Sequence, residues 1–221
     1  NQVITVFFKD QGYTPSQVAS FFLISSIPWF IKPIYGLISD FVPLFGRRRK
    51  SYFLLTCTLA ALSGICLALT PVQTFWWMAA LFTIMGFGLA FTDVLTDALM
   101  VESGRPLGLT GAFQAVQWAC ITGSAVLIGV VGGHLAATRE LHLAFGIAAC
   151  FPLVSFAMAL FFVHEARARR DLAALRATAR AIREALTHRN VWMVAGFLFF
   201  YTFSPSFGPA FLYYQADVLG F

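Results

Sequence analysis

Long apolar runs alternate with short polar segments along this chain, and the length of the runs predicts membrane-spanning helices. A helix needs about 20 residues to cross roughly 30 Å of hydrocarbon. Six apolar runs reach about that length, at residues 17–39, 52–69, 74–101, 111–135, 141–163 and 191–214. A shorter apolar run, residues 1–8, has the character of the end of a further span. The pattern therefore predicts an all-α, polytopic membrane protein with six complete spans and a stub.

Composition supports this fold class. The chain is 59% hydrophobic and 11% charged, whereas roughly 25% of residues are charged in a soluble globular domain. The net charge of +5 could indicate nucleic-acid binding. However, the cations lie between apolar runs and not on a polar face interleaved with stacking aromatics. We therefore predict contact with a lipid bilayer and no nucleic-acid partner.

The positions of the cations predict an orientation. Of the 15 Lys and Arg residues, 12 fall in the loops at 40–50, 102–110 and 164–190. Lys9 and Arg139 fall on the opposite side, and Lys32 lies within a span. Because basic residues collect in cytoplasmic loops, we predict that these three loops are cytosolic and that the chain crosses the plasma or inner cell membrane several times.

The basic segment 164–190 predicts a division of the chain. Apolar residues recur there at spacings of three and four, among several arginines, which is typical of an amphipathic helix; they are Leu172, Leu175, Ala179, Ile182 and Leu186. Such a helix could lie on an anionic inner leaflet or bind a soluble partner. We expect residues 1–163 to form a six-helix bundle with its first span mostly missing, and residues 191–221 to begin a second bundle. The chain would then be a fragment.

Charged residues within the spans are the first candidates for function. Lys32 precedes Asp40 by eight residues and Asp93 precedes Glu102 by nine, so Lys32 and Asp93 should lie at similar depth. An unpaired charge in hydrocarbon is costly, and such residues usually face a partner or water. Two interpretations stay open: a structural ion pair, or a transport site in which Asp93 exchanges a proton and Lys32 attracts an anionic solute. Asp97 shares the face of Asp93 and is a candidate for the same transport site, but it lies closer to the cytosol and could instead belong to the charged network at that end.

Three segments carry a family resemblance. Residues 31–49 contain IKPIYGLISD followed by PLFGRRR, residues 93–102 read DVLTDALMVE, and residues 211–221 end in LGF. These segments resemble the folate-biopterin transporter family of the major facilitator superfamily. The resemblance implies two helical bundles, alternating access and a cytosolic latch that stabilises the outward-facing state. On this view the latch comprises Gly36, Asp40, Gly46, Arg47, Arg48, Arg49, Glu102 and Arg105. Alternatively, the cations only set topology.

Gly36 would allow close helix approach, because it has no side chain to hold two backbones apart. We expect the same of glycines in the fifth span, Gly123, Gly129, Gly132 and Gly133. In the seventh span, Pro205 and Pro209 predict a break or kink.

The fifth span also offers polar and aromatic groups. Gln114 and Gln117 share a face and Trp118 follows. These side chains could bind the edge and stack on the ring of a pterin, or they could tie helices together. Both interpretations stay open.

Other chemistry has weak support. The four cysteines lie within spans and the four histidines lack metal-ligand spacing, so we predict no disulfide, metal, cofactor or catalytic residue. An intramembrane aspartyl protease would need aspartates from two facing helices, whereas Asp93 and Asp97 lie on one. We therefore predict a proton-coupled secondary transporter of folate or pterin-like solutes that is active as a monomer. S-adenosylmethionine as solute and a seven-span receptor or channel are the alternatives.

Overall fold

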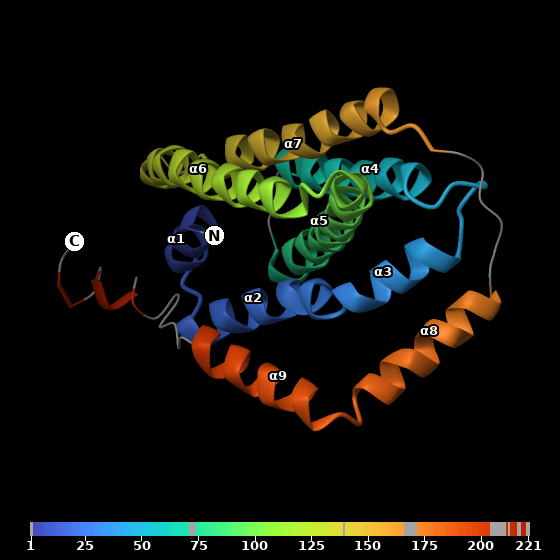
Figure 1. The fold of residues 1–221 in the computed structure, drawn as a ribbon. Helices are drawn as coiled ribbons and strands as arrows, with labels where there is room; N and C mark the ends of the chain where they lie inside the picture. The colour runs from blue at the N-terminus through green and yellow to red at the C-terminus, as the bar shows by residue number, and fades with distance from the viewer. Residues whose placement is uncertain are drawn as a thin grey trace.

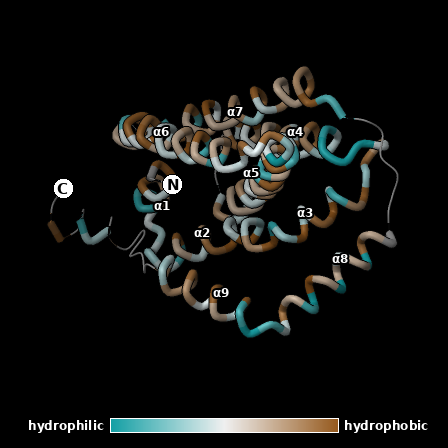
Figure 2. The backbone as a smooth tube through the Cα atoms, in the orientation of Figure 1, coloured by the Kyte–Doolittle hydropathy of each residue, from teal (hydrophilic) through white to brown (hydrophobic). Residues whose placement is uncertain are grey.

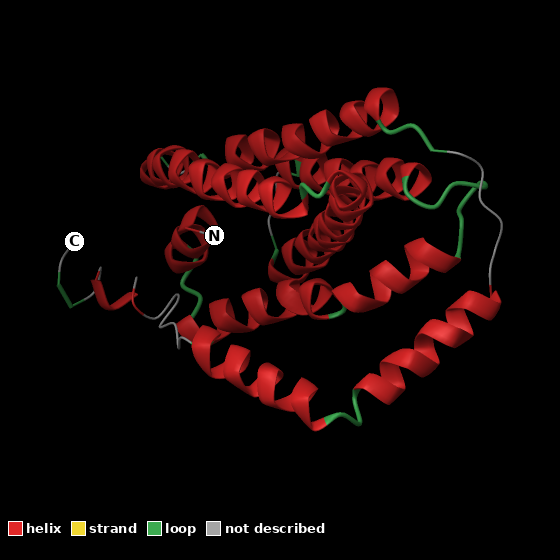
Figure 3. Cartoon of the chain, viewed as in Figure 1, coloured by secondary structure: helices red, strands yellow, loops and turns green. Residues whose placement is uncertain are grey.

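The helical class is confirmed in the part of the chain that the structure describes. This computed structural model describes residues 2–70, 74–138, 140–165, 172–203, 211, 213–215 and 218–219, and every regular element within them is a helix (Figure 3). In chain order the elements are α1 Gln2–Asp10, α2 Pro15–Phe30, α3 Lys32–Phe41, α4 Lys50–Leu69, α5 Phe75–Gly104, the 3₁₀ turn η1 Arg105–Leu107, α6 Thr110–Ala137, α7 Leu141–Phe162, α8 Leu172–Ala185 and α9 Arg189–Thr202.

Five of the six predicted complete spans are helical segments long and apolar enough to cross a membrane. In the described residues they are Pro15–Phe41, Lys50–Leu69, Phe75–Leu107, Thr110–Ala137 and Leu141–Phe162. The sixth prediction, residues 191–214, begins as α9 but is described as a continuous helix only to Thr202. Pro205 and Pro209, where we expected a kink, lie outside the described residues.

The span at residues 17–39 differs from the prediction, because it is two helices and not one. The backbone leaves helical geometry at Ile31, with φ −96° and ψ 10°, and α3 begins at Lys32. Pro33 has no N–H to continue the ladder and its ring crowds the preceding turn. The Ile34 N–H instead bonds the Ile31 carbonyl at 3.0 Å. Lys32 therefore lies at a break in the span.

The core is centred on α4, which packs against α5 and α7, while α5 also packs against α2 and α3 (Figure 1). Glycine permits the closest approaches. A Cβ at Gly88 of α5 would lie 2.5 Å from the Thr56 carbonyl oxygen of α4, and one at Gly64 of α4 would lie 2.9 Å from the Ala149 Cβ of α7. Any larger residue at Gly88 would push the two helices apart.

Two clusters of buried apolar side chains fill the bundle. One lies where α4 ends and includes Phe8, Phe21, Leu67, Met78 and Phe145. The other lies where α4 begins and includes Tyr35, Tyr52, Phe91, Leu95 and Ala159. Apolar residues dominate the helices, and hydrophilic residues gather where α4 begins and α7 ends (Figure 2). The second cluster thus supports the polar end of the bundle.

The prediction that the α6 glycines mark close helix packing is wrong for the described residues. A Cβ at Gly123, Gly129, Gly132 or Gly133 would meet no atom within 4 Å. Most α6 side chains are exposed, and the helix contacts α1, α5 and α7 over limited regions. Close approaches occur instead at Gly64 and Gly88, and at Gly104 of α5, where a Cβ would lie 2.7 Å from Phe113 Cδ2 of α6.

The segment after α7 folds back along the bundle. As predicted, it contains an amphipathic helix, α8, which contacts α3. Ile182 of α8 and Leu186, in the turn after α8, are exposed. The Trp192 indole N–H donates to the Leu186 carbonyl at 2.8 Å. The described side chains of α9 are not buried. The assignment of α9 to a second bundle stays a prediction.

Candidate functional site

Two groups of charged residues lie at different levels of the bundle. The first, which we call the intramembrane pair, is Lys32 with Asp93. The second, which we call the Arg49 cluster, consists of Arg49, Ser39, Asp40 and Glu102 at the end where α4 begins. The sequence predicted both groups in part, and the structure adds further partners to each.

The intramembrane pair joins α3 to α5. Lys32 Nζ lies 2.5 Å from Asp93 Oδ2, and the two side chains are 32% and 34% exposed. The same ammonium lies 4.5 Å from the centroid of the Trp29 ring, within the range of a cation–π interaction. The expected pairing of Lys32 with Asp93 is therefore present, and it occurs at the break between α2 and α3.

The position of Lys32 explains why a carboxylate lies opposite it. The first turn of a helix carries partial positive charge, and Lys32 is the first residue of α3. Burial of the ammonium adds a desolvation cost, which a nearby carboxylate offsets. Removal of Asp93 would leave a cation in an unfavourable position. The break, the cation and the aspartate therefore form one local arrangement.

Asp97 has a different partner. Gln117 Nε2 of α6 donates to Asp97 Oδ1 at 2.7 Å, so the two aspartates of α5 connect to different helices. Gln114 and Trp118 are exposed, with Trp118 at 61%. Of the three fifth-span candidates, Gln117 therefore ties helices together in this structure.

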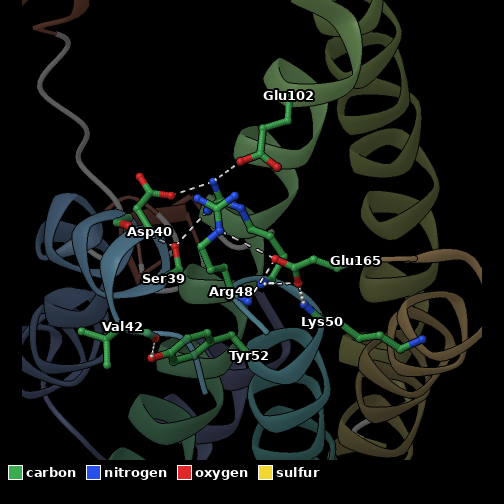
Figure 4. Close-up of polar contacts among 10 residues, drawn as sticks. Ser39, Asp40, Val42, Arg48, Lys50, Tyr52, Glu102 and Glu165 are labelled. Atoms are coloured by element: carbon green, nitrogen blue, oxygen red, sulfur yellow. Dashed lines mark hydrogen bonds and ion pairs between the residues drawn. The ribbon is translucent and has the colours of Figure 1, made fainter. Parts of the chain in front are cut away.

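Ser39, Asp40 and Glu102 of the Arg49 cluster lie close together (Figure 4), and Arg49 contacts all three. Its Nη2 lies 2.6 Å from Asp40 Oδ1 and 2.7 Å from Glu102 Oε1, and its Nη1 donates to Ser39 Oγ at 3.0 Å. The Arg49 side chain is 6% exposed, whereas the carboxylates are 41% and 46% exposed. The predicted proximity of Asp40, Glu102 and this run of cations is confirmed. The latch function stays a prediction.

The other cations of the predicted latch lie differently. Arg47, Arg48 and Arg105 are exposed. Arg48 Nε is 4.0 Å from Glu165, and within the described residues Arg47 and Arg105 make no ion pair. Arg49 alone among them is buried with carboxylates. The structure therefore concentrates the predicted network on one arginine.

The two glycines of the predicted latch, Gly46 and Gly36, occupy different structural settings. Phe45 and Gly46 have φ of 52° and 75°, and Leu44 and Arg47 exchange two backbone hydrogen bonds of 3.0 Å. Two positive φ angles in succession are typical of a type I′ turn, which favours glycine. A Cβ at Gly36 would lie 3.7 Å from Val94 Cγ1, an ordinary contact. Gly36 therefore faces α5, but a methyl group would fit there, so the expected close approach that requires glycine is not present at this position.

Sequence reasoning missed Trp29, Ser39 and Glu165. Trp29 precedes Lys32 by three residues, a spacing that could have placed both on one face. Ser39 adjoins Asp40, but an uncharged serine gives no sequence signal of a contact with arginine. Glu165 has no local signal, because its partners lie 115 to 117 residues earlier in the chain. Only the tertiary structure brings it to α4.

Comparisons with known proteins give a family match. The sequence model of the BT1 family matches residues 1–221. The chain is 28% identical to a folate-biopterin transporter of Synechocystis, over 99% of the chain and 45% of that protein. It is 29% identical to folate transporter 1 of Plasmodium falciparum, over 75% of the chain and 33% of that protein.

A probable folate-biopterin transporter 4 of Arabidopsis thaliana is 28% identical over 60% of the chain and 28% of its own length. The chain thus spans less than half the length of these relatives. No solved structure matches it. Because the family match covers every residue, the chain belongs to the BT1 family.

Proposed function

We propose that the complete gene product containing this chain is a secondary active transporter of folate or pterin-like solutes, working by alternating access and coupled to protons. The observation that carries this proposal is the intramembrane pair, a lysine and an aspartate 2.5 Å apart at a helix break. Broken spans and paired charges are common where transporters bind solutes and ions. The names of the relatives supply the solute class.

The chemistry of the pair suits such a solute. Folate carries an aromatic pterin ring and carboxylates. Lys32 could bind a carboxylate as a hydrogen-bonded ion pair, and Trp29, which is 44% exposed, offers an indole for ring stacking. A neutral aliphatic solute would use neither group. An anionic, aromatic solute is therefore the class that this pair fits best.

Coupling would follow from competition for Lys32. When Asp93 is ionised it holds the ammonium, and when Asp93 takes up a proton the attraction is lost and Lys32 becomes free for a solute anion. Release of the proton from Asp93 on the other side of the membrane would restore the ion pair with Lys32, and this would expel the anion. This cycle needs no nucleotide, and it gives each residue of the pair a separate role.

The Arg49 cluster would act as the cytosolic latch. Arg49 holds α3 to α5 through Asp40 and Glu102, so opening toward the cytosol would separate groups that are now 2.6 and 2.7 Å apart. We further propose that loops 40–50, 102–110 and 164–190 face the cytosol, that the membrane is the plasma or inner membrane, and that the transporter acts as a monomer.

The test is uptake of radiolabelled folate, biopterin and S-adenosylmethionine by cells expressing the complete gene product, measured with and without an imposed proton gradient. We expect gradient-dependent uptake of folate or biopterin that Lys32→Ala reduces. Uptake of S-adenosylmethionine alone would correct the solute class. Absence of saturable uptake of all three, in cells where the protein reaches the membrane, would contradict the proposal.

A further inference from the structure

We propose that Glu165 is a positioning residue for the Arg49 cluster, through which the start of the segment 164–190 holds α4 in place. Glu165 follows the end of α7, and its carboxylate reaches the beginning of α4 (Figure 4). The contact itself is independent of the solute. Its effect on transport rests on the proposed function.

α4 has no cap of its own. Arg49 occupies the N-cap position and makes no side-chain capping hydrogen bond, so the first N–H groups of the helix need other acceptors. Glu165 Oε1 accepts from the Arg48 N–H at 3.0 Å, and its Oε2 accepts from the N–H groups of Arg49 and Lys50 at 2.9 and 3.2 Å. One carboxylate, from the segment that follows α7, thus supplies the cap.

The charge of Glu165 suits this place. Anions are stabilised at the amino end of a helix, and the Glu165 side chain is only 16% exposed, so screening by water is limited. Arg48 Nε lies 4.0 Å from the same carboxylate and adds a weak attraction. An uncharged acceptor would keep part of the hydrogen bonding but lose the attraction to the helix end.

The capped residue is also the centre of the cluster. Glu165 binds the backbone of Arg49, and the side chain of Arg49 binds Asp40 and Glu102. Within the described residues the buried Arg49 Nε makes no hydrogen bond, so only the two terminal nitrogens anchor the guanidinium. The position of these nitrogens depends on where the backbone is held. Glu165 therefore acts on the cluster through Arg49.

A second contact joins the same two helices at this end. Lys50 Nζ donates to the Leu160 carbonyl at 2.6 Å, which lies in the last turn of α7, where carbonyls lack helical partners. A cavity of about 340 Å³ lies beside these contacts, lined by Arg47, Lys50, Val163, His164 and Glu165. Lys50 of α4 thus caps the end of α7, and Glu165, from the segment after α7, caps the start of α4.

The first experiment measures amide hydrogen exchange at Arg48, Arg49 and Lys50 in the purified complete protein in lipid nanodiscs. Loss of a hydrogen bond to a charged group corresponds to about 1.5–3 kcal/mol, so Glu165→Ala should accelerate exchange there by at least about tenfold. Glu165→Gln should have a smaller effect. Glu184→Gln, which removes a charge from exposed α8, is the matched control and should change nothing.

The second experiment is a double-mutant cycle on uptake with Glu165→Gln and Asp40→Asn. If both residues act through Arg49, the double variant should lose little more activity than the more impaired single variant, because their effects overlap. Glu165→Asp should partly restore uptake. The Glu165→Gln, Glu184→Gln double variant should match Glu165→Gln alone.

The two experiments distinguish the contact made by Glu165, its positioning role and the proposed transport function. Unchanged exchange at residues 48–50 in Glu165→Ala would overturn the proposed contact. Faster exchange with multiplicative uptake defects in the double variant would leave Glu165 as a helix cap only, and would overturn the positioning role. If the wild-type protein transports none of the solutes, the proposed function fails. The exchange measurement would still test the contact.

Discussion

At the scale of single residues, the two groups of charged residues differ in how far the sequence could predict their positions. Lys32 and Asp93 could be paired by counting residues from the cytosolic ends of their spans, because helices rise by a fixed amount per residue. The sequence could predict that the cations and carboxylates of the Arg49 cluster lie close together. It could not predict which of the four consecutive cations binds the carboxylates. That choice depends on the turn at Phe45 and Gly46, whose positive φ angles set the direction in which the chain enters α4.

The intramembrane pair gives the first prediction. Asp93→Asn should abolish proton-driven accumulation of solute, because an amide cannot exchange the proton. Asp97→Asn, one turn away on the same helix, should reduce accumulation much less, because Asp97 bonds Gln117 and not Lys32. The measurement is accumulation of labelled folate across a range of external pH. Equal losses in the two variants would show that the pair has no special role.

Lys32 gives a second prediction from the same site. Lys32→Ala should raise the apparent KM for anionic solutes by about tenfold, the effect of losing one charged hydrogen bond. For uncharged pterins the apparent KM should change far less, which makes these solutes the internal control. The same increase for charged and uncharged solutes would mean that Lys32 only supports the fold.

Asp40 gives the third prediction. When Asp40→Asn removes one carboxylate, Arg49 would retain its ion pair with Glu102. Because Asp40 is partly exposed, the loss should be about 1 kcal/mol, which shifts the ratio of closed to open cytosolic states by about fivefold. Modification of a cysteine introduced at the cytosolic side should report the shift, with membrane insertion unchanged. Unaltered modification and uptake would leave these cations with a topological role.

At the scale of elements, the sequence was most informative about helix existence and least informative about helix faces. Apolar runs of sufficient length located five spans, because length and hydropathy alone determine whether a helix can cross a bilayer. The break at Ile31 was missed although Pro33 follows it, since proline is tolerated in membrane helices when neighbouring groups satisfy the freed carbonyl. The glycines of α6 were misinterpreted, because composition does not show which helix face is covered.

Glycine packing gives the fourth prediction. Gly88→Ala should lower the stability of the protein by about 1–3 kcal/mol, because the new methyl group would lie 2.5 Å from the Thr56 carbonyl oxygen and 2.9 Å from the Ala60 Cβ. Gly123→Ala on α6 is the matched control, since its methyl group would meet no atom within 4 Å. The thermal midpoint in detergent is the measurement. Equal midpoints for the two variants would contradict the packing described for α4 and α5.

At the scale of the whole molecule, the described helices place α4 and α7 side by side and leave α9 outside that contact (Figure 1). The two packed helices are also joined at their far end, where His142 Nδ1 lies 2.9 Å from the Ala68 carbonyl oxygen. α4 and α7 therefore share contacts at both ends as well as along their length. We expect them to move as one unit.

Cross-linking gives the fifth prediction. In a variant whose native cysteines are replaced by serine, Gly64→Cys with Ala149→Cys should form a disulfide, because the two Cβ positions, 2.9 Å apart in the structure, reach the usual Cβ–Cβ separation of about 3.5–4.5 Å once the helices move apart by about 1 Å. Phe197→Cys on α9 with Ala149→Cys should not. Gel mobility after oxidation separates the products. Efficient cross-linking of the α9 pair would place that helix among α2 to α7 and contradict the two-bundle organisation.

The long chain separation of the contacts around Arg49 has a consequence for biosynthesis. Asp40 precedes Arg49, Glu102 follows it by 53 residues and Glu165 by 116. During translation the start of α4 therefore reaches the membrane long before its capping carboxylate exists. Nascent chains that stop before residue 165 lack the carboxylate that accepts from the N–H groups of Arg48, Arg49 and Lys50. We therefore expect the start of α4 to reach its final hydrogen bonding only after α7 has been inserted.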